Sequence, residues 1–205
     1  MSDSGNTPLN QRRRYPTDRT AAISDGVFAV ALTLLILNVK PPDRGTGELA
    51  KALISVAPSL GIFALSFAIV AYYWVVHHLI FVSMRGVSVG LLWANFAFLF
   101  TIVVLPFSTA VLGGDALAPP ALALYGLNLA ACTTTLTGAW YVAERGGLIE
   151  RLLPKQRRYI VLRLTIQVLV ALFGVGCAFV LPVLALTIFV AFPVIYALSY
   201  RRRYY

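Results

Sequence analysis

The chain has 205 residues, of which 59% are hydrophobic and 12% are charged, with a mean hydropathy of +0.80 and a formal net charge of +9. Soluble domains are about 45–50% apolar and about 25% charged, so this composition excludes a soluble globular protein and indicates a membrane protein with several spans. At about 20 residues a span, the length allows five to seven crossings and no separate domain outside the membrane. The basic residues flank the apolar runs, as the positive-inside bias requires, so the charge does not indicate a nucleic-acid partner.

The first apolar stretch is RTAAISDGVFAVALTLLILNV, residues 19–39, and it follows a polar tail at residues 1–18 that we expect in the cytoplasm. We predict a span over 20–39, because about 20 helical residues cover roughly 30 Å. Lys40 and two prolines end it. After Asp25 the stretch is apolar except for Thr33 and Asn38. A carboxylate inside a membrane helix is costly, so Asp25 marks a candidate functional site.

The remaining apolar stretches predict five more spans. One helix over residues 159–200 would be about 63 Å long, so we predict two helices there, joined at Leu181 and Pro182. A boundary or kink is expected near Pro58, and the aromatic residues 72–74 suit the headgroup belt. Both cysteines, Cys132 and Cys177, lie in apolar runs and are predicted to be buried without a disulfide. The other predicted spans cover residues 52–82, 87–112 and 121–143.

The charge distribution favours six spans with both termini in the cytoplasm. This topology places 14 of the 17 basic residues on the cytoplasmic side, whereas five spans would move the arginines at 201–203 outside. We therefore predict an all-α transmembrane domain at residues 19–200 between cytoplasmic tails at 1–18 and 201–205.

The start of the first span carries a recognisable pattern. Arg19, Ile23, Ser24 and Asp25 read R-x-x-x-I-S-D. This resembles the RxxxFSD signature of the transmembrane protein 175 family, the endolysosomal potassium channels and their bacterial homologues, with isoleucine in place of phenylalanine. The stretches DGVFAVALTLLILNV, WVVHHLIF and LLWANFAFLFTIVVLPFST extend the resemblance over most of the chain.

The resemblance implies a homotetramer in a bacterial plasma membrane, whose first helices line a central potassium pore without a cofactor or a carbonyl filter. The offset from Asp25 assigns the constriction to Val30, followed by Leu34 and Leu37. Independently of the family, Val30, Thr33, Leu34 and Leu37 are spaced i, i+3, i+4, i+7 and so share one stripe of a helix. Thr33 would add a ring of hydroxyl groups, and an apolar constriction can gate by dewetting.

Seven polar and aromatic residues fall at the cytoplasmic level of the predicted bundle. The family resemblance implies that such residues form a network between helices, and we expect it to satisfy Asp25 and to fix the rotation of the first helix. A simple helix cap by Ser24 or Asp25 is the alternative. Which of the two histidines takes part is left open. The members are Arg19, Ser24, Asp25, His77, His78, Trp93 and Asn95.

Other functions are weaker interpretations. A hydrolase using Ser24 and Asp25 lacks a glycine elbow and a second acid within the spans, so no enzyme is predicted. A proton channel or proton-coupled transporter using Asp25 with His77 or His78 is the stronger alternative, although residues 30–37 carry no titratable group. A scaffold without transport is a third. The expected partners are copies of the chain, the bilayer and monovalent cations, with potassium as the permeant ion and no metal site.

Overall fold

The computed structural model describes residues 16–42, 49–149 and 154–201. In these ranges the chain forms six α-helices and one 3₁₀ turn, which confirms the predicted number of helices. The elements are α1 (Thr17–Leu34), η1 (Leu35–Asn38), α2 (Leu49–Val82), α3 (Val89–Gly114), α4 (Pro119–Arg145), α5 (Pro154–Ala178) and α6 (Pro182–Arg201).

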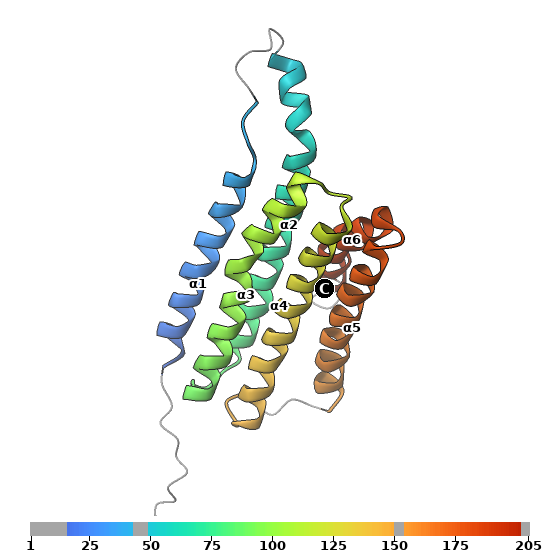
Figure 1. The fold of residues 1–205 in the computed structure, drawn as a ribbon. Helices are drawn as coiled ribbons and strands as arrows, with labels where there is room; N and C mark the ends of the chain where they lie inside the picture. Colours follow the sequence, from blue (N-terminus) through green and yellow to red (C-terminus); the bar gives the residue numbers. More distant parts are fainter. Residues whose placement is uncertain (1–15, 43–48, 150–153, 202–205) are drawn as a thin grey trace, which may run out of the picture.

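The helices form an elongated bundle with α4 near its centre (Figure 1). α4 packs against α3 on one side and α5 on the other, whereas α1 packs against α2 and α3 at the edge of the bundle. α1 and α3 run in the same direction, so the first part of α1 lies beside the first part of α3 (Figure 1). The edge position leaves one long face of α1 uncovered.

Among the residues that the structure describes, four helical stretches are long and apolar enough to cross a membrane: Thr17–Asn38, Ala50–Val82, Val89–Gly114 and Lys155–Ala178. α4 does not meet this criterion, because its middle carries Asn128 and a run of threonines. A helix enclosed by other helices tolerates polar groups that lipid would not, since the protein supplies their hydrogen bonds. In α6 the described apolar stretch, Pro182–Ala191, is shorter than a span requires. Six crossings therefore stay a prediction.

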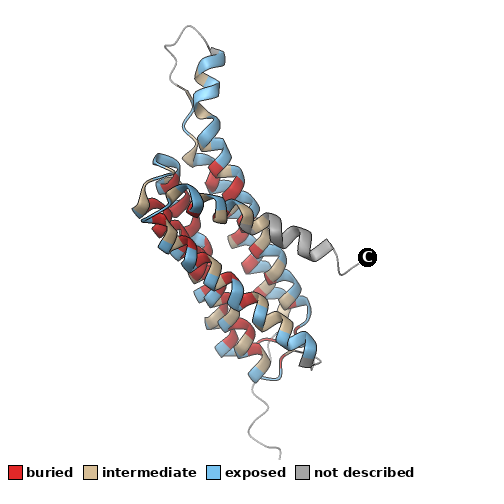
Figure 2. Ribbon diagram, turned by 90° about the vertical axis from the view of Figure 1, so that its right-hand side faces the viewer, coloured by how far each residue is buried: buried red, intermediate tan, exposed pale blue. Residues whose placement is uncertain are grey.

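Most helix ends differ from the predicted ends by two to five residues, and the largest shift is in α5, which begins at Pro154 instead of residue 159. α1 begins at Thr17 instead of residue 20, after Pro16, whose backbone is extended. α2 continues through Pro58, so no helix boundary lies there. The turns before Pro58 are largely exposed and extend past the other helices (Figures 1 and 2). Residues 1–15 and 202–205 of the predicted tails lie outside the described residues.

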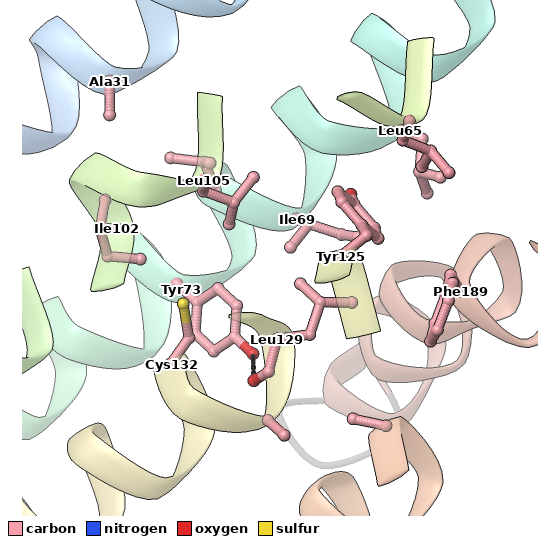
Figure 3. Close-up of a cluster of buried hydrophobic side chains, with 14 of the residues drawn as sticks. Ala31, Leu65, Ile69, Tyr73, Ile102, Leu105, Tyr125, Leu129, Cys132 and Phe189 are labelled. Carbon is pink, nitrogen blue, oxygen red and sulfur yellow. Dashed lines mark hydrogen bonds between the residues drawn. The ribbon is translucent and has the colours of Figure 1, made fainter. Parts of the chain in front are cut away.

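The main hydrophobic core lies where α1 to α4 meet, with Tyr73 near its centre (Figure 3). Tyr73 is fully buried; its hydroxyl donates to the carbonyl of Leu129 at 3.0 Å and lies 2.8 Å from Thr133 Oγ1. Its assignment to the headgroup belt is therefore wrong, because α4 supplies the partners that a buried phenol needs. Cys132 is buried in the same core, Cys177 is half-buried, and both are free thiols as predicted.

α6 is attached to the bundle through Phe189, which fits against two glycines. A Cβ atom at Gly126 would lie 2.7 Å from Phe189 Cζ, and one at Gly174 would lie 2.6 Å from Phe189 Cε1. The absence of side chains at these positions of α4 and α5 allows the ring of α6 to approach both backbones.

The end of the bundle that carries the α2–α3 and α4–α5 connections is here called the inner end. α4 stops there with Gly147 at φ +62°, and the amides of Gly147 and Leu148 donate to the carbonyls of Glu144 and Ala143 at 3.1 and 3.0 Å. This is a Schellman termination, which favours glycine at the left-handed position. Leu148 then accepts a hydrogen bond from the Arg85 amide at 2.8 Å, so the two connections are joined.

Candidate functional site

α1 has a buried face and an exposed face. The predicted stripe lies on the exposed one: Val30 is 57% exposed, Leu34 41% and Leu37 73%, and Thr33 is also exposed. These side chains therefore point away from the bundle of the single chain. The buried face consists of Thr20, Ser24, Phe28, Ala31 and Leu35.

Thr33 is the hydroxyl residue of the exposed stripe. Its Oγ1 lies 2.9 Å from the Val30 carbonyl and 3.1 Å from the Ala29 carbonyl, so its proton is donated within α1. The oxygen lone pairs stay free to accept, which is the property that a cation or a water molecule requires.

Three buried side chains from three helices form a chain of hydrogen bonds at the inner end, which we call the inner network. Asn95 of α3 donates through Nδ2 to Ser24 Oγ of α1 at 3.0 Å, and its Oδ1 lies 2.9 Å from His77 Nε2 of α2. Ser24 in turn donates to the Thr20 carbonyl at 2.9 Å. Because an amide oxygen only accepts, this arrangement places a proton on His77 Nε2. The network joins the buried face of α1 to α3 and, through Asn95, to α2.

Three aromatic rings lie around His77. Its ring stacks on Phe81 at a centroid distance of 4.2 Å and on Phe98 at 5.6 Å, and Phe28 of α1 lies at 5.7 Å. His77 is only 2% exposed. The imidazole is therefore held in one orientation by packing as well as by its hydrogen bond.

Asp25 lies outside the inner network, on the exposed side of α1. Trp74 Nε1 donates to Asp25 Oδ1 at 2.8 Å, and the Trp74 ring stacks on His78 at 5.5 Å. Adjacent helical residues point about 100° apart, so once Ser24 faces α3, Asp25 must face away from it. Within the described ranges, no three His, Cys, Asp or Glu side chains are placed to hold a metal ion.

Some members of the predicted set are not brought together. Arg19 is exposed, and Trp93 is 72% exposed and contacts Phe96 instead of Asp25. The helix-cap alternative does not fit either, because α1 begins at Thr17, so Ser24 lies about two turns inside the helix, where it donates to the Thr20 carbonyl. Of the two histidines, His77 joins the inner network.

Sequence reasoning did not assign a site role to two residues whose side chains join α1 or η1 to a neighbouring helix. Trp74 is the donor to Asp25, and its spacing of four residues from His78 was the available signal, since i and i+4 share a helix face. Asn38 donates through Nδ2 to the Pro106 carbonyl of α3 at 2.9 Å. The sequence feature that could have indicated this role is that Asn38 is an isolated polar residue at the end of an apolar run.

Known proteins are similar to this chain over a range that includes the residues described above. The family model described as endosomal/lysosomal potassium channel TMEM175 matches residues 19–106. A crystal structure of a lysosomal potassium-selective channel TMEM175 homolog from Chamaesiphon minutus aligns with a TM-score of 0.79 and 27% identity, over 89% of this chain and 97% of that one. The chain is similar to the TMEM175 channels in fold over most of its length and in sequence over residues 19–106.

Relatives in the TMEM175 family include bacterial and mammalian proteins. A potassium channel of Streptomyces collinus is 35% identical over 134 residues, which span 63% of this chain and 65% of that protein. The human endosomal/lysosomal proton channel TMEM175 is 39% identical over 77 residues, 33% of this chain and 15% of that protein. The family consists of ion channels and not enzymes, and this chain is an integral membrane protein. The matched residues 19–106 include the exposed stripe and the inner network.

Proposed function

We propose that the chain is a potassium channel whose pore is surrounded by α1 from four copies. The observation that carries this proposal is the alignment of nearly the whole chain with a solved potassium-selective channel homolog at 27% identity. The potassium channel of Streptomyces collinus supports the same activity. Four copies and the central position of α1 come from the family resemblance.

The exposed face of α1 gives the proposal a physical basis. Asp25 and Thr33 lie on the surface of the single chain within a stretch apolar enough to span a membrane. A carboxylate facing lipid is costly, whereas one facing a water-filled conduit or another copy is not. Assembly with α1 towards the axis removes that cost.

In this assembly Val30, Leu34 and Leu37 form an apolar constriction, with the Thr33 hydroxyl groups between them. Such a constriction conducts when it is wide enough to hold water and closes by dewetting. A narrow apolar ring forces partial dehydration, which costs less for potassium than for the more tightly hydrated sodium ion. The inner network acts as the support that sets the rotation of α1, and the Asp25–Trp74 contact acts at the inner mouth.

The proposed orientation places both termini in the cytoplasm of a bacterial cell, with the protein in the plasma membrane. The basic tails at 1–18 and 201–205 then flank one transmembrane unit, as the positive-inside bias requires.

The test is potassium flux into liposomes that contain the purified protein, followed by recordings under potassium and sodium gradients. Val30→Ala should weaken the discrimination between the two ions, because it widens the constriction. Val103→Ala is the matched control, since Val103 is 53% exposed on α3 and Val30 is 57% exposed on α1. Wild-type liposomes without potassium flux would refute the channel, and equal selectivity in both variants would refute the role of Val30.

Proton conduction is the second candidate, favoured by the buried hydrogen bond of His77 and by the human relative described as a proton channel. Residues 30–37 carry no titratable side chain, so protons would have to cross this part of α1 on water. Measuring the reversal potential with opposed potassium and pH gradients separates the two ions.

A further inference from the structure

At the end of the bundle opposite the inner end, here called the outer end, η1 continues α1 and is attached to α3 by Asn38, a residue outside the R-x-x-x-I-S-D pattern. Asn38 is the last residue of η1, it is half-buried, and its Nδ2 donates to the Pro106 carbonyl at 2.9 Å. At the inner end, Asn95 of α3 donates to Ser24. The segment proposed to line the pore, α1 with η1, is thus hydrogen-bonded to α3 at Ser24 and again at Asn38.

The turn of α3 that contains Pro106, the acceptor of Asn38, lacks one backbone hydrogen bond of the helix. Pro106 has no amide hydrogen, so α3 lacks its hydrogen bond to the Ile102 carbonyl. With its amide oriented to satisfy its neighbours, Asn128 of α4 donates to the Thr101 carbonyl at 3.1 Å and accepts from the Leu105 amide at 3.2 Å. A side chain of α4 therefore supplies hydrogen bonds to the backbone of this turn. The Pro106 carbonyl that accepts from Asn38 directly follows these residues.

η1, the segment that contains Asn38, has little conformational stability of its own. η1 is a 3₁₀ turn of four residues, a conformation whose hydrogen bonds have poorer geometry than those of an α-helix and which is stable only in short pieces. Its own closing bond joins the Val39 amide to the Ile36 carbonyl at 3.0 Å. Leu37, the outermost residue of the exposed stripe, lies in this turn and is 73% exposed. Its direction therefore depends on what holds the turn.

We propose that Asn38 is a positioning residue for the outer end of the pore. Its hydrogen bond to the Pro106 carbonyl holds η1 against α3 and so aims Leu37, as the inner network aims the first part of α1. This role rests on the proposed function, because the direction of Leu37 matters for conduction only if α1 surrounds the conduit. A purely structural role would hold the helix end without affecting conduction.

The contact is tested first without reference to conduction. Asn38→Leu keeps a similar size and removes the donor, Asn38→Gln keeps a donor, and Ile36→Ala changes an exposed side chain of the same turn. Hydrogen exchange is measured on the protein in lipid nanodiscs. The amides of η1 and Val39 should exchange about five-fold faster in Asn38→Leu, the loss expected for one hydrogen bond. The other two variants should exchange like the wild type.

Single-channel recordings in potassium then test the positioning role. Asn38→Leu should change the conductance or the open probability by about two-fold or more, with rescue in Asn38→Gln and no change in Ile36→Ala. Unchanged exchange in Asn38→Leu overturns the contact, and faster exchange with unchanged conduction overturns the positioning role. A wild-type protein without potassium current overturns the proposed function and this role with it, whereas a current insensitive to Asn38 overturns this role alone.

Discussion

Asn95→Ala is expected to destabilise the bundle by about 2–4 kcal/mol, because Asn95 joins two buried side chains. It bonds to Ser24 at 3.0 Å and to His77 at 2.9 Å. Hydrogen bonds between membrane helices average about 0.6 kcal/mol each, so the two together contribute about 1.2 kcal/mol. The larger cost comes from His77, which is 2% exposed and loses its side-chain partner. An unsatisfied buried polar group costs about 1–3 kcal/mol.

The same reasoning predicts partial recovery in a double variant. His77→Phe removes the unsatisfied imidazole and keeps an aromatic ring against Phe81 and Phe98, on which His77 stacks. Combined with Asn95→Ala, it should restore about 1–2 kcal/mol, since removing both partners of a buried bond costs less than removing one.

Reversible unfolding in detergent micelles measures these differences. Trp93→Phe is the control, because Trp93 is 72% exposed, and it should change the free energy of unfolding by less than about 0.5 kcal/mol. The reasoning fails if Asn95→Ala costs no more than this control, or if adding His77→Phe destabilises the protein further.

Two other substitutions test the remaining contacts. Trp74→Phe removes the donor to Asp25, a contact between exposed groups, so the free energy of unfolding should fall by no more than about 1 kcal/mol. If Asp25 acts at the pore mouth, single-channel recordings should show a changed open probability; an unaltered one would argue against that role. Gly174→Ala should cost about 1–3 kcal/mol, because the new Cβ would lie 2.6 Å from Phe189 Cε1. Gly176→Ala in the same helix meets nothing within 4 Å and should be neutral or stabilising; equal effects at the two glycines would contradict this packing.

The sequence by itself determined the features that depend on local spacing. Apolar runs of sufficient length specify the helices, and helical spacing predicts one stripe for Val30, Thr33, Leu34 and Leu37, which the structure finds exposed along α1 and η1. Composition alone was enough to identify a membrane protein. Helical periodicity is a property of neighbouring residues, so no tertiary information is needed to predict it.

Only the tertiary structure decided which side chains form hydrogen bonds between helices. The sequence could not choose between His77 and His78, and it did not identify Trp74 as the donor to Asp25 or assign Asn38 a partner. Adjacent residues on a helix point about 100° apart, so a small change in rotation exchanges which of them meets a neighbouring helix. That rotation is set by the packing of distant segments against one another, which local spacing does not encode.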